Sequence, residues 1–138
     1  LEKRGVKEEV SLVVSGGFYV PGQFLKALAL GADAVYLGSA ILFAATHTQN
    51  LKALPFEPPT QVVWEHGKYK DQFKVEEGEK AAEQFFTSCV EEMKIGLRAM
   101  GKRSLKELSK KDLVSYDELT AKMADIPYSF EPWEQEKG

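Results

Sequence analysis

Two short glycine turns are the places where this sequence has the residue types to bind an anion. Ser15-Gly16-Gly17 follows one apolar run, and Gly38-Ser39 follows the next. Glycine lets the backbone approach a ligand closely and adopt positive φ. The start of a helix adds N–H donors without partners and a partial positive charge. Together these features predict a phosphate site built from backbone amides.

Each turn taken alone has a simpler explanation, because glycine marks tight turns between strands and helices in general. The pair is more informative, since Gly38 stands 22 positions after Gly16, which is about one strand–helix repeat. In a (β/α)8 barrel, the loops that follow strands seven and eight converge on a phosphate. We therefore expect Ser15, Gly16, Gly17, Gly38 and Ser39 to line one site.

The elements around the turns form a strand–helix–strand pattern. Residues 10–14 are an almost continuous apolar run, which is typical of a strand buried on both faces of a parallel sheet. Pro21 suits the first position of a helix and Gly31 suits the position after its end. Residues 34–37 are the second strand. This is a βαβ unit, for which a right-handed crossover is expected.

The rest of the chain has longer side chains, carries more charge and is predicted to be mostly helical. A helix is expected from Ala40, and residues 61–64 and 69–75 are candidates for a hairpin around a His66-Gly67 turn. The longest helix is predicted over residues 77–100, ended by Gly101. Its apolar stripe consists of Ala82, Phe85, Phe86, Cys89, Met93, Leu97 and Met100. Capping boxes at 104–107 and 115–118 predict two short helices before an aromatic tail that packs down or stays loose.

Length and composition limit the function classes. The chain has 138 residues, against about 250 in a complete barrel, and starts at Leu1, so a piece of a barrel is expected. The net charge of −3 gives no sign of a nucleic-acid face. The single cysteine, Cys89, excludes an internal disulfide and a multi-cysteine metal site. No apolar run is long enough for a membrane span, and no signal peptide is visible. A cytoplasmic protein is expected, with an anchor upstream left open.

Residues 15–39, SGGFYVPGQFLKALALGADAVYLGS, resemble the last repeat of flavin- and nucleotide-binding barrels such as glutamate synthase and inosine-monophosphate dehydrogenase. The segment from Glu91 to Val114 resembles the helical part that follows the barrel in glutamate synthase. The chain thus resembles the C-terminal portion of an FMN-binding, large-subunit-like member of that family, over residues 10–115. The implied fold is α/β: the last βαβ portion of a (β/α)8 TIM barrel with a mainly helical C-terminal extension.

The resemblance implies a division of the chain and a role for each part. Residues 1–53 would be the last two strand–helix units of a flavin-binding barrel, 54–76 a Pro-rich connector with a possible hairpin, and 77–138 the helical extension and tail. The paired turns would line the FMN phosphate site of an FMN-dependent oxidoreductase of glutamate metabolism. Tyr19 stands where family barrels commonly have an arginine, which removes a charge-assisted contact. Other barrel strands would carry the catalytic groups and the small-molecule substrate, so this chain alone is expected to be inactive.

One departure from the family concerns the iron–sulfur cluster. Glutamate synthases carry three closely spaced cysteines after strand eight, and the corresponding stretch here is Thr46-His47-Thr48-Gln49-Asn50. A threonine stands where the family has a cysteine beside the histidine, and Cys89 lies far away on a helix. Thiolates hold such clusters, so we expect no cluster and a cluster-free branch of the family.

Other residues and functions stay open as alternatives. His47 has the chemistry to touch a ligand, but His47, His66 and Lys26 are most simply surface groups, and Cys89 a buried thiol. The phosphate could belong to the substrate of a non-redox barrel enzyme. The chain could also be a non-catalytic α/β oligomerisation module. In either case two strands without neighbours leave open edges, so self-association of this piece is expected.

Overall fold

The computed structural model describes residues 5–49 and 59–130, which form a small parallel sheet and a set of helices along it. The strands are β1 (Val13–Ser15) and β2 (Ala34–Tyr36), and the helices between and after them are α1 (Pro21–Ala29) and α2 (Ser39–Thr46). The remaining helices are α3 (Thr60–Val63), α4 (Val75–Ala99) and α5 (Glu118–Ala124). Single 3-10 turns lie at Lys7–Glu9, Lys70–Gln72, Leu105–Glu107 and Lys110–Asp112.

The predicted βαβ unit is confirmed. β1 and β2 pair in parallel, with Val13 opposite Ala34, and α1 connects them. Pro21 is the first residue of α1, and Gly31, with φ of 103°, directly follows its C-cap. Asp33 fixes the entry to both strands, because its carboxylate accepts the Leu12 amide at 2.7 Å and its own amide donates to the Leu12 carbonyl at 2.8 Å.

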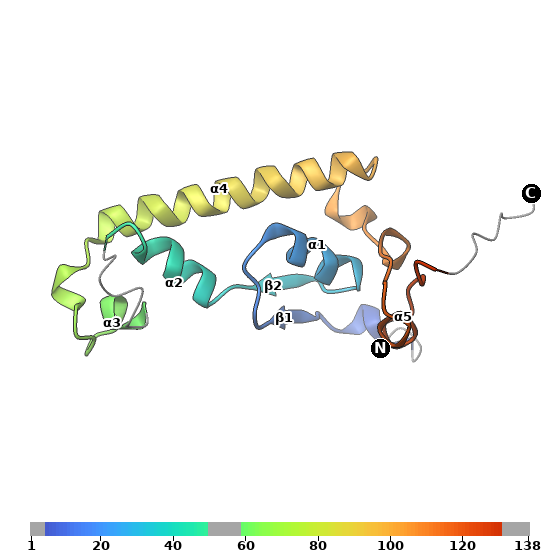
Figure 1. The fold of residues 1–138 in the computed structure, drawn as a ribbon, viewed down its shortest axis with the longest axis horizontal. Coiled ribbons are helices and arrows are strands. Elements are labelled where there is room, and N and C mark those ends of the chain that lie inside the picture. Colours follow the sequence, from blue (N-terminus) through green and yellow to red (C-terminus); the bar gives the residue numbers. More distant parts are fainter. Residues whose placement is uncertain (1–4, 50–58, 131–138) are drawn as a thin grey trace, which may run out of the picture.

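The two strands are much more exposed than their apolar sequence predicts. Val13 is 43% exposed and Tyr36 is 66% exposed, so the expectation of strands buried on both faces is wrong for this structure. The described residues supply only two strands, and α1 covers one side of them (Figure 1). Burial on both faces needs further strands and helices at the open edges.

Helix α4 is the longest element and runs along α2 and α1 (Figure 1). The predicted stripe is confirmed at Cys89 and Leu97, which are buried, whereas Phe86 is 49% exposed. The helices approach closely at Gly96, where a Cβ would lie 2.8 Å from Cδ1 of Leu25 in α1. Small residues on α1 and α2 complete this core, which contains Phe24, Ala27, Ala29, Ala40 and Ala44.

The hairpin expected over 61–75 is not formed. The structure has α3 and the 3-10 turn Lys70–Gln72 in its place, while residues 54–58 of the connector lie outside the described part. Val62 is 1% exposed and anchors α3. The turn that was expected to separate two strands instead folds back on the helix, since the Tyr69 amide donates to the Gln61 carbonyl at 2.9 Å. Tertiary contacts therefore override the β-branched local sequence here.

The C-terminal part differs from the expected caps in detail. Ser104 does cap its element, accepting the Lys106 amide at 3.2 Å, but the element is a 3-10 turn. The cap of α5 is Asp117, whose carboxylate accepts the Thr120 amide at 2.7 Å. Ser115 is buried and donates its hydroxyl to the Asp117 carbonyl, and a bridge joins it to Tyr128. The start of the tail therefore pairs with Ser115 through Tyr128 and Ser129, whereas Phe130 is 70% exposed and Trp133 lies outside the described residues.

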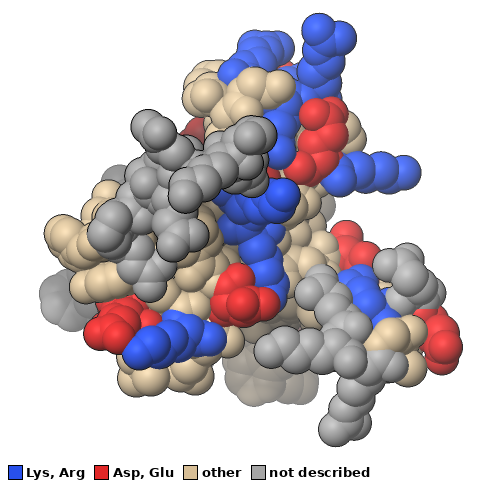
Figure 2. All heavy atoms as spheres, turned by 90° about the vertical axis from the view of Figure 1, so that its right-hand side faces the viewer, with Lys and Arg blue, Asp and Glu red and all other residues tan. Residues whose placement is uncertain are grey.

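The helical surface carries charged side chains as well as exposed apolar ones, such as Ile95 and Met123. Basic and acidic side chains are interspersed on the face at the C-terminal end of the molecule (Figure 2). Within residues 5–49 and 59–130, no helix is both long enough and apolar enough to cross a membrane.

Candidate functional site

The register of the sheet brings the two glycine turns to one edge. Ser15 lies opposite Tyr36, so Gly16-Gly17 and Leu37-Gly38 leave neighbouring parallel strands at the same end. Adjacent strands are about 4.8 Å apart, which places the two turns side by side. The structure therefore brings the two predicted turns together at one edge of the sheet. We refer to Ser15–Gly17 and Gly38–Ser39 below as the paired turns.

The glycines of the first turn are required by the backbone. Gly16 has φ of 110° and Gly17 has φ of 69°, which is the left-handed region that other residues rarely adopt. Both are exposed, and a Cβ on either would meet no atom within 4 Å. The Cα faces of this turn are therefore open to an approaching group.

Gly38 differs from these two in an informative way. Its φ is −115°, so no positive φ explains the glycine, and a Cβ there would also meet nothing within 4 Å. Its ψ is −88°, outside the α and β regions that residues with a Cβ favour, so the backbone conformation is one reason for glycine there. Close approach of a ligand to the backbone is a remaining reason for glycine at such a position.

Helix α2 starts at the second turn and presents its N-terminus there. Gly38 is its N-cap, no side chain caps it, and Ser39 is exposed. The first amides of a helix have no acceptor within the helix, and such amides attract anions. Buried Ala40 and Ala44 hold α2 in place, and α2 packs against α4.

Side-chain cations are absent from the sequence around both turns. The chain has no lysine or arginine between Lys7 and Lys26, and none between Lys26 and Lys52. Tyr19, in the position where an arginine is common, is 46% exposed. Any anion held by the paired turns thus depends on backbone amides and hydroxyls within these stretches.

Gln23, which no sequence motif above includes as a site residue, holds the loop that connects the first turn to α1. Gln23, the third residue of α1, accepts the amides of Tyr19 at 2.8 Å and Val20 at 3.2 Å through its side-chain oxygen. The side chain of Val20, at the N-cap, has no atom that can accept a hydrogen bond. A glutamine three residues after the N-cap is the second half of a capping box, and that spacing was the available signal.

The remaining candidate residues lie away from the paired turns or contact other groups. His47 follows α2 at its far end, about 13.5 Å along the axis from Gly38, and its Nδ1 lies 3.3 Å from the Ala44 carbonyl. His66 is exposed and stacks edge-on against Trp64. Burial raises the pKa of the Cys89 thiol, and Glu92 raises it further, so the thiol stays protonated. Lys26 is exposed.

The stretch that corresponds to the cluster-binding segment offers hydroxyls instead of thiolates. Thr46 is 1% exposed and donates its hydroxyl to the Leu42 carbonyl at 2.6 Å, whereas Thr48 is exposed. Cys89 is the single cysteine of the sequence. In residues 5–49 and 59–130 no group of three or more His, Cys, Asp or Glu side chains has the arrangement of a metal site. The donor set of this chain does not fit an iron–sulfur cluster.

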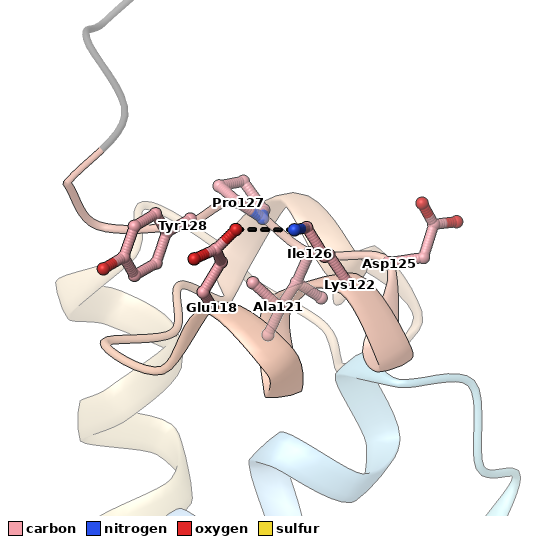
Figure 3. Close-up of a pocket in the computed structure, with 7 residues that line it drawn as sticks. All are labelled: Glu118, Ala121, Lys122, Asp125, Ile126, Pro127 and Tyr128. Carbon is pink, nitrogen blue, oxygen red and sulfur yellow. Dashed lines mark hydrogen bonds and ion pairs between the residues drawn. The ribbon is translucent and has the colours of Figure 1, made fainter.

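Besides a hollow of about 520 Å³ along α4, two hollows formed by described residues include no residue of the paired turns. One, of about 510 Å³, lies beside α5 and is lined by Glu118, Ala121, Lys122, Asp125, Ile126, Pro127 and Tyr128 (Figure 3). Its charges are paired, Glu118 with Lys122 inside and Asp125 with Lys110 at 3.6 Å. The other, of about 280 Å³, is apolar and lies between α1, β2 and α4.

Comparison with known proteins decides the family. The model of a conserved region in glutamate synthase matches residues 1–103, which include both turns and all of α4. The chain belongs to the glutamate synthase family. A glutamate synthase large subunit-like protein of Rhizobium meliloti (strain 1021) is 31% identical over 155 aligned positions, covering all of this chain and 35% of that protein.

Shorter matches reach other glutamate synthases. An archaeal-type glutamate synthase [NADPH] of Dehalococcoides mccartyi is 50% identical over 44 residues, which are 32% of this chain and 9% of that protein. The archaeal glutamate synthase [NADPH] of Methanocaldococcus jannaschii is 46% identical over a segment of the same length and coverage. The chain thus spans about a third or less of the length of these relatives. No solved structure matches it significantly.

Proposed function

We propose that this glutamate synthase family chain contributes the FMN phosphate site of an FMN-dependent oxidoreductase of glutamate metabolism. The observation that carries the proposal is the parallel pairing of β1 with β2. It sets two glycine turns with open Cα faces beside each other, at the N-terminus of α2. Backbone amides at such a place bind phosphate without a side-chain cation.

The arrangement agrees with the phosphate end of a barrel. In many (β/α)8 barrels, the loops after strands seven and eight and the N-terminus of a short extra helix form the phosphate site. β1 and β2 correspond to those strands in this proposal, and α2, with eight residues, corresponds to the short extra helix. The exposed strand faces at Val13 and Tyr36 are the surfaces that the other barrel strands and their helices would cover.

The residues of this chain would bind and orient the flavin. The glycines allow the phosphate to come close to the backbone, and the α2 N-terminus stabilises its negative charge. When bound, FMN supplies hydride or single-electron transfer. The groups that act near the flavin ring and the small-molecule substrate lie on other strands of the barrel, so this chain alone is inactive.

Reconstitution of the complete protein with FMN tests the proposal. We expect purified complete protein to show bound-flavin absorbance, and mass spectrometry of the released ligand to identify FMN. A colourless protein that does not bind added FMN would contradict the proposal. Release of a nucleotide or sugar phosphate instead would support a non-redox barrel enzyme that uses the same paired turns.

A further inference from the structure

Gln23 occupies two amides in the loop that connects the first glycine turn to α1. Its Oε1 lies 2.8 Å from the Tyr19 nitrogen and 3.2 Å from the Val20 nitrogen. The next residue, Pro21, has no N–H. The three positions before Gly22 therefore offer no amide to a ligand, and the loop is held to α1 by the Gln23 side chain together with the ring contact of Phe18 with Phe24.

The amides nearer the glycines are the ones left for an anion. Among the residues that the structure describes, the amides of Gly17 and Phe18 have no backbone or side-chain acceptor. The positive φ of Gly16 and Gly17 turns the backbone just before them. Successive amides in such a turn form an anion-binding concavity. Their direction depends on where the loop goes next, which Gln23 determines.

The neutral charge of Gln23 also matters. A carboxylate in its place would accept the same two amides, but it would add a negative charge within a few residues of the candidate anion site. Like charges at short range disfavour binding. Lys26, three positions later on α1, is the single lysine or arginine between Lys7 and Lys52, so little positive charge is available in this stretch to offset the added carboxylate.

We propose that Gln23 is a positioning residue for phosphate binding. It aims the amides that follow Gly16 by holding those of Tyr19 and Val20, and it does so without charge. This inference rests on the proposed function. It assigns Gln23 an effect on the phosphate group of the ligand and none on the flavin ring.

Comparison of FMN with riboflavin isolates that effect, because the two ligands differ only by the phosphate. In the complete protein, Gln23→Met removes the acceptor at similar length and without charge. We expect it to weaken FMN binding about tenfold, in line with the loss of two hydrogen bonds, and to leave riboflavin binding unchanged. Lys26→Met, on the exposed side of the same helix one turn later, is the matched control and should change neither Kd.

Gln23→Glu gives a second, independent test. It retains the acceptor, so the melting temperature without flavin should stay at the wild-type value, while FMN binding weakens and riboflavin binding does not. Equal weakening of both ligands by Gln23→Met would show a merely structural role and overturn the inference. Wild-type FMN affinity in both variants would overturn it as well. A wild-type protein that binds neither flavin would contradict the proposed function itself.

Discussion

At the scale of single residues, the three glycines of the paired turns differ in the physical reason for having no side chain. Gly16 and Gly17 are in the left-handed region, whereas Gly38 is not, and all three have open Cα faces. The sequence alone indicates all three glycines, but it does not separate the two at positive φ from Gly38, whose φ is −115° and ψ −88°. That distinction needs the backbone angles of each glycine. Because its φ is negative, Gly38 is the glycine at which an alanine tests ligand binding without introducing a side chain at positive φ.

Gly38→Ala in the complete protein is expected to weaken FMN binding by at least about tenfold, since its Cβ projects where the phosphate approaches. The free energy of unfolding should fall less than in a glycine variant at positive φ, because the φ of Gly38 is negative and that Cβ meets no protein atom within 4 Å. Gly17→Ala is the contrasting variant and should also lose about 1–2 kcal/mol of stability through its positive φ. Unchanged FMN affinity in Gly38→Ala would argue against the site.

Asp33 is a single residue that should make the stability of the fold depend on pH. The hydrogen bond from Lys7 and then the Leu12 amide hold the pKa of its carboxyl below the ordinary 3.8. A lowered pKa contributes stability above the unfolded value, and this contribution is lost as the pH falls through the folded pKa. We expect Asp33→Asn to be less stable than wild type at neutral pH, with the difference disappearing below pH 3.8. Urea unfolding across this range measures it, and a difference that persists in acid contradicts the assignment.

At the scale of elements, the sequence predicts the βαβ unit and α4 well. Pro21 and Gly31 mark both ends of α1 by backbone chemistry that is local. The stretch from 61 to 75 was predicted wrongly, because its β-branched residues favour strands locally while burial of Val62 favours α3. Gln23 was missed because a capping box is recognised by a Ser or Thr at the N-cap together with a Glu or Gln three residues later. Here the N-cap is Val20, whose side chain accepts no hydrogen bond, so only the glutamine of the pattern is present.

Burial along α4 predicts how single truncations affect stability. Leu97 is 7% exposed, so Leu97→Ala should cost about 2–5 kcal/mol by leaving a cavity. Ile95 is on the same helix but 62% exposed, so Ile95→Ala should cost about 0.5 kcal/mol or less. Chemical denaturation of both variants tests the packing of α4, and similar losses would contradict it.

At the scale of the whole molecule, the open sheet is the main feature that no local pattern could show. The apolar strand sequences predict burial, and the structure leaves Leu12, Val13 and Tyr36 at 37%, 43% and 66% exposure. The missing cover is a long-range property, because it depends on strands that pair at the sheet edges. The chain spans 35% of its Rhizobium meliloti relative, which leaves room for such strands in a complete protein.

We expect the isolated chain to self-associate through this open sheet, as a dimer or larger assembly. Unpaired strand edges and exposed apolar side chains favour pairing with a second copy. Light scattering over a range of concentrations measures the mass directly. A stable monomer at high concentration would show that the exposed strands do not drive association.

The central claim is that the paired turns hold the phosphate of FMN. An experimental structure of the complete protein with FMN tests it most directly. We expect phosphate oxygens about 3 Å from backbone amides of the Gly16–Gly17 turn and of the α2 N-terminus at Ser39. A phosphate bound elsewhere, with the paired turns facing solvent or another part of the protein, would contradict it.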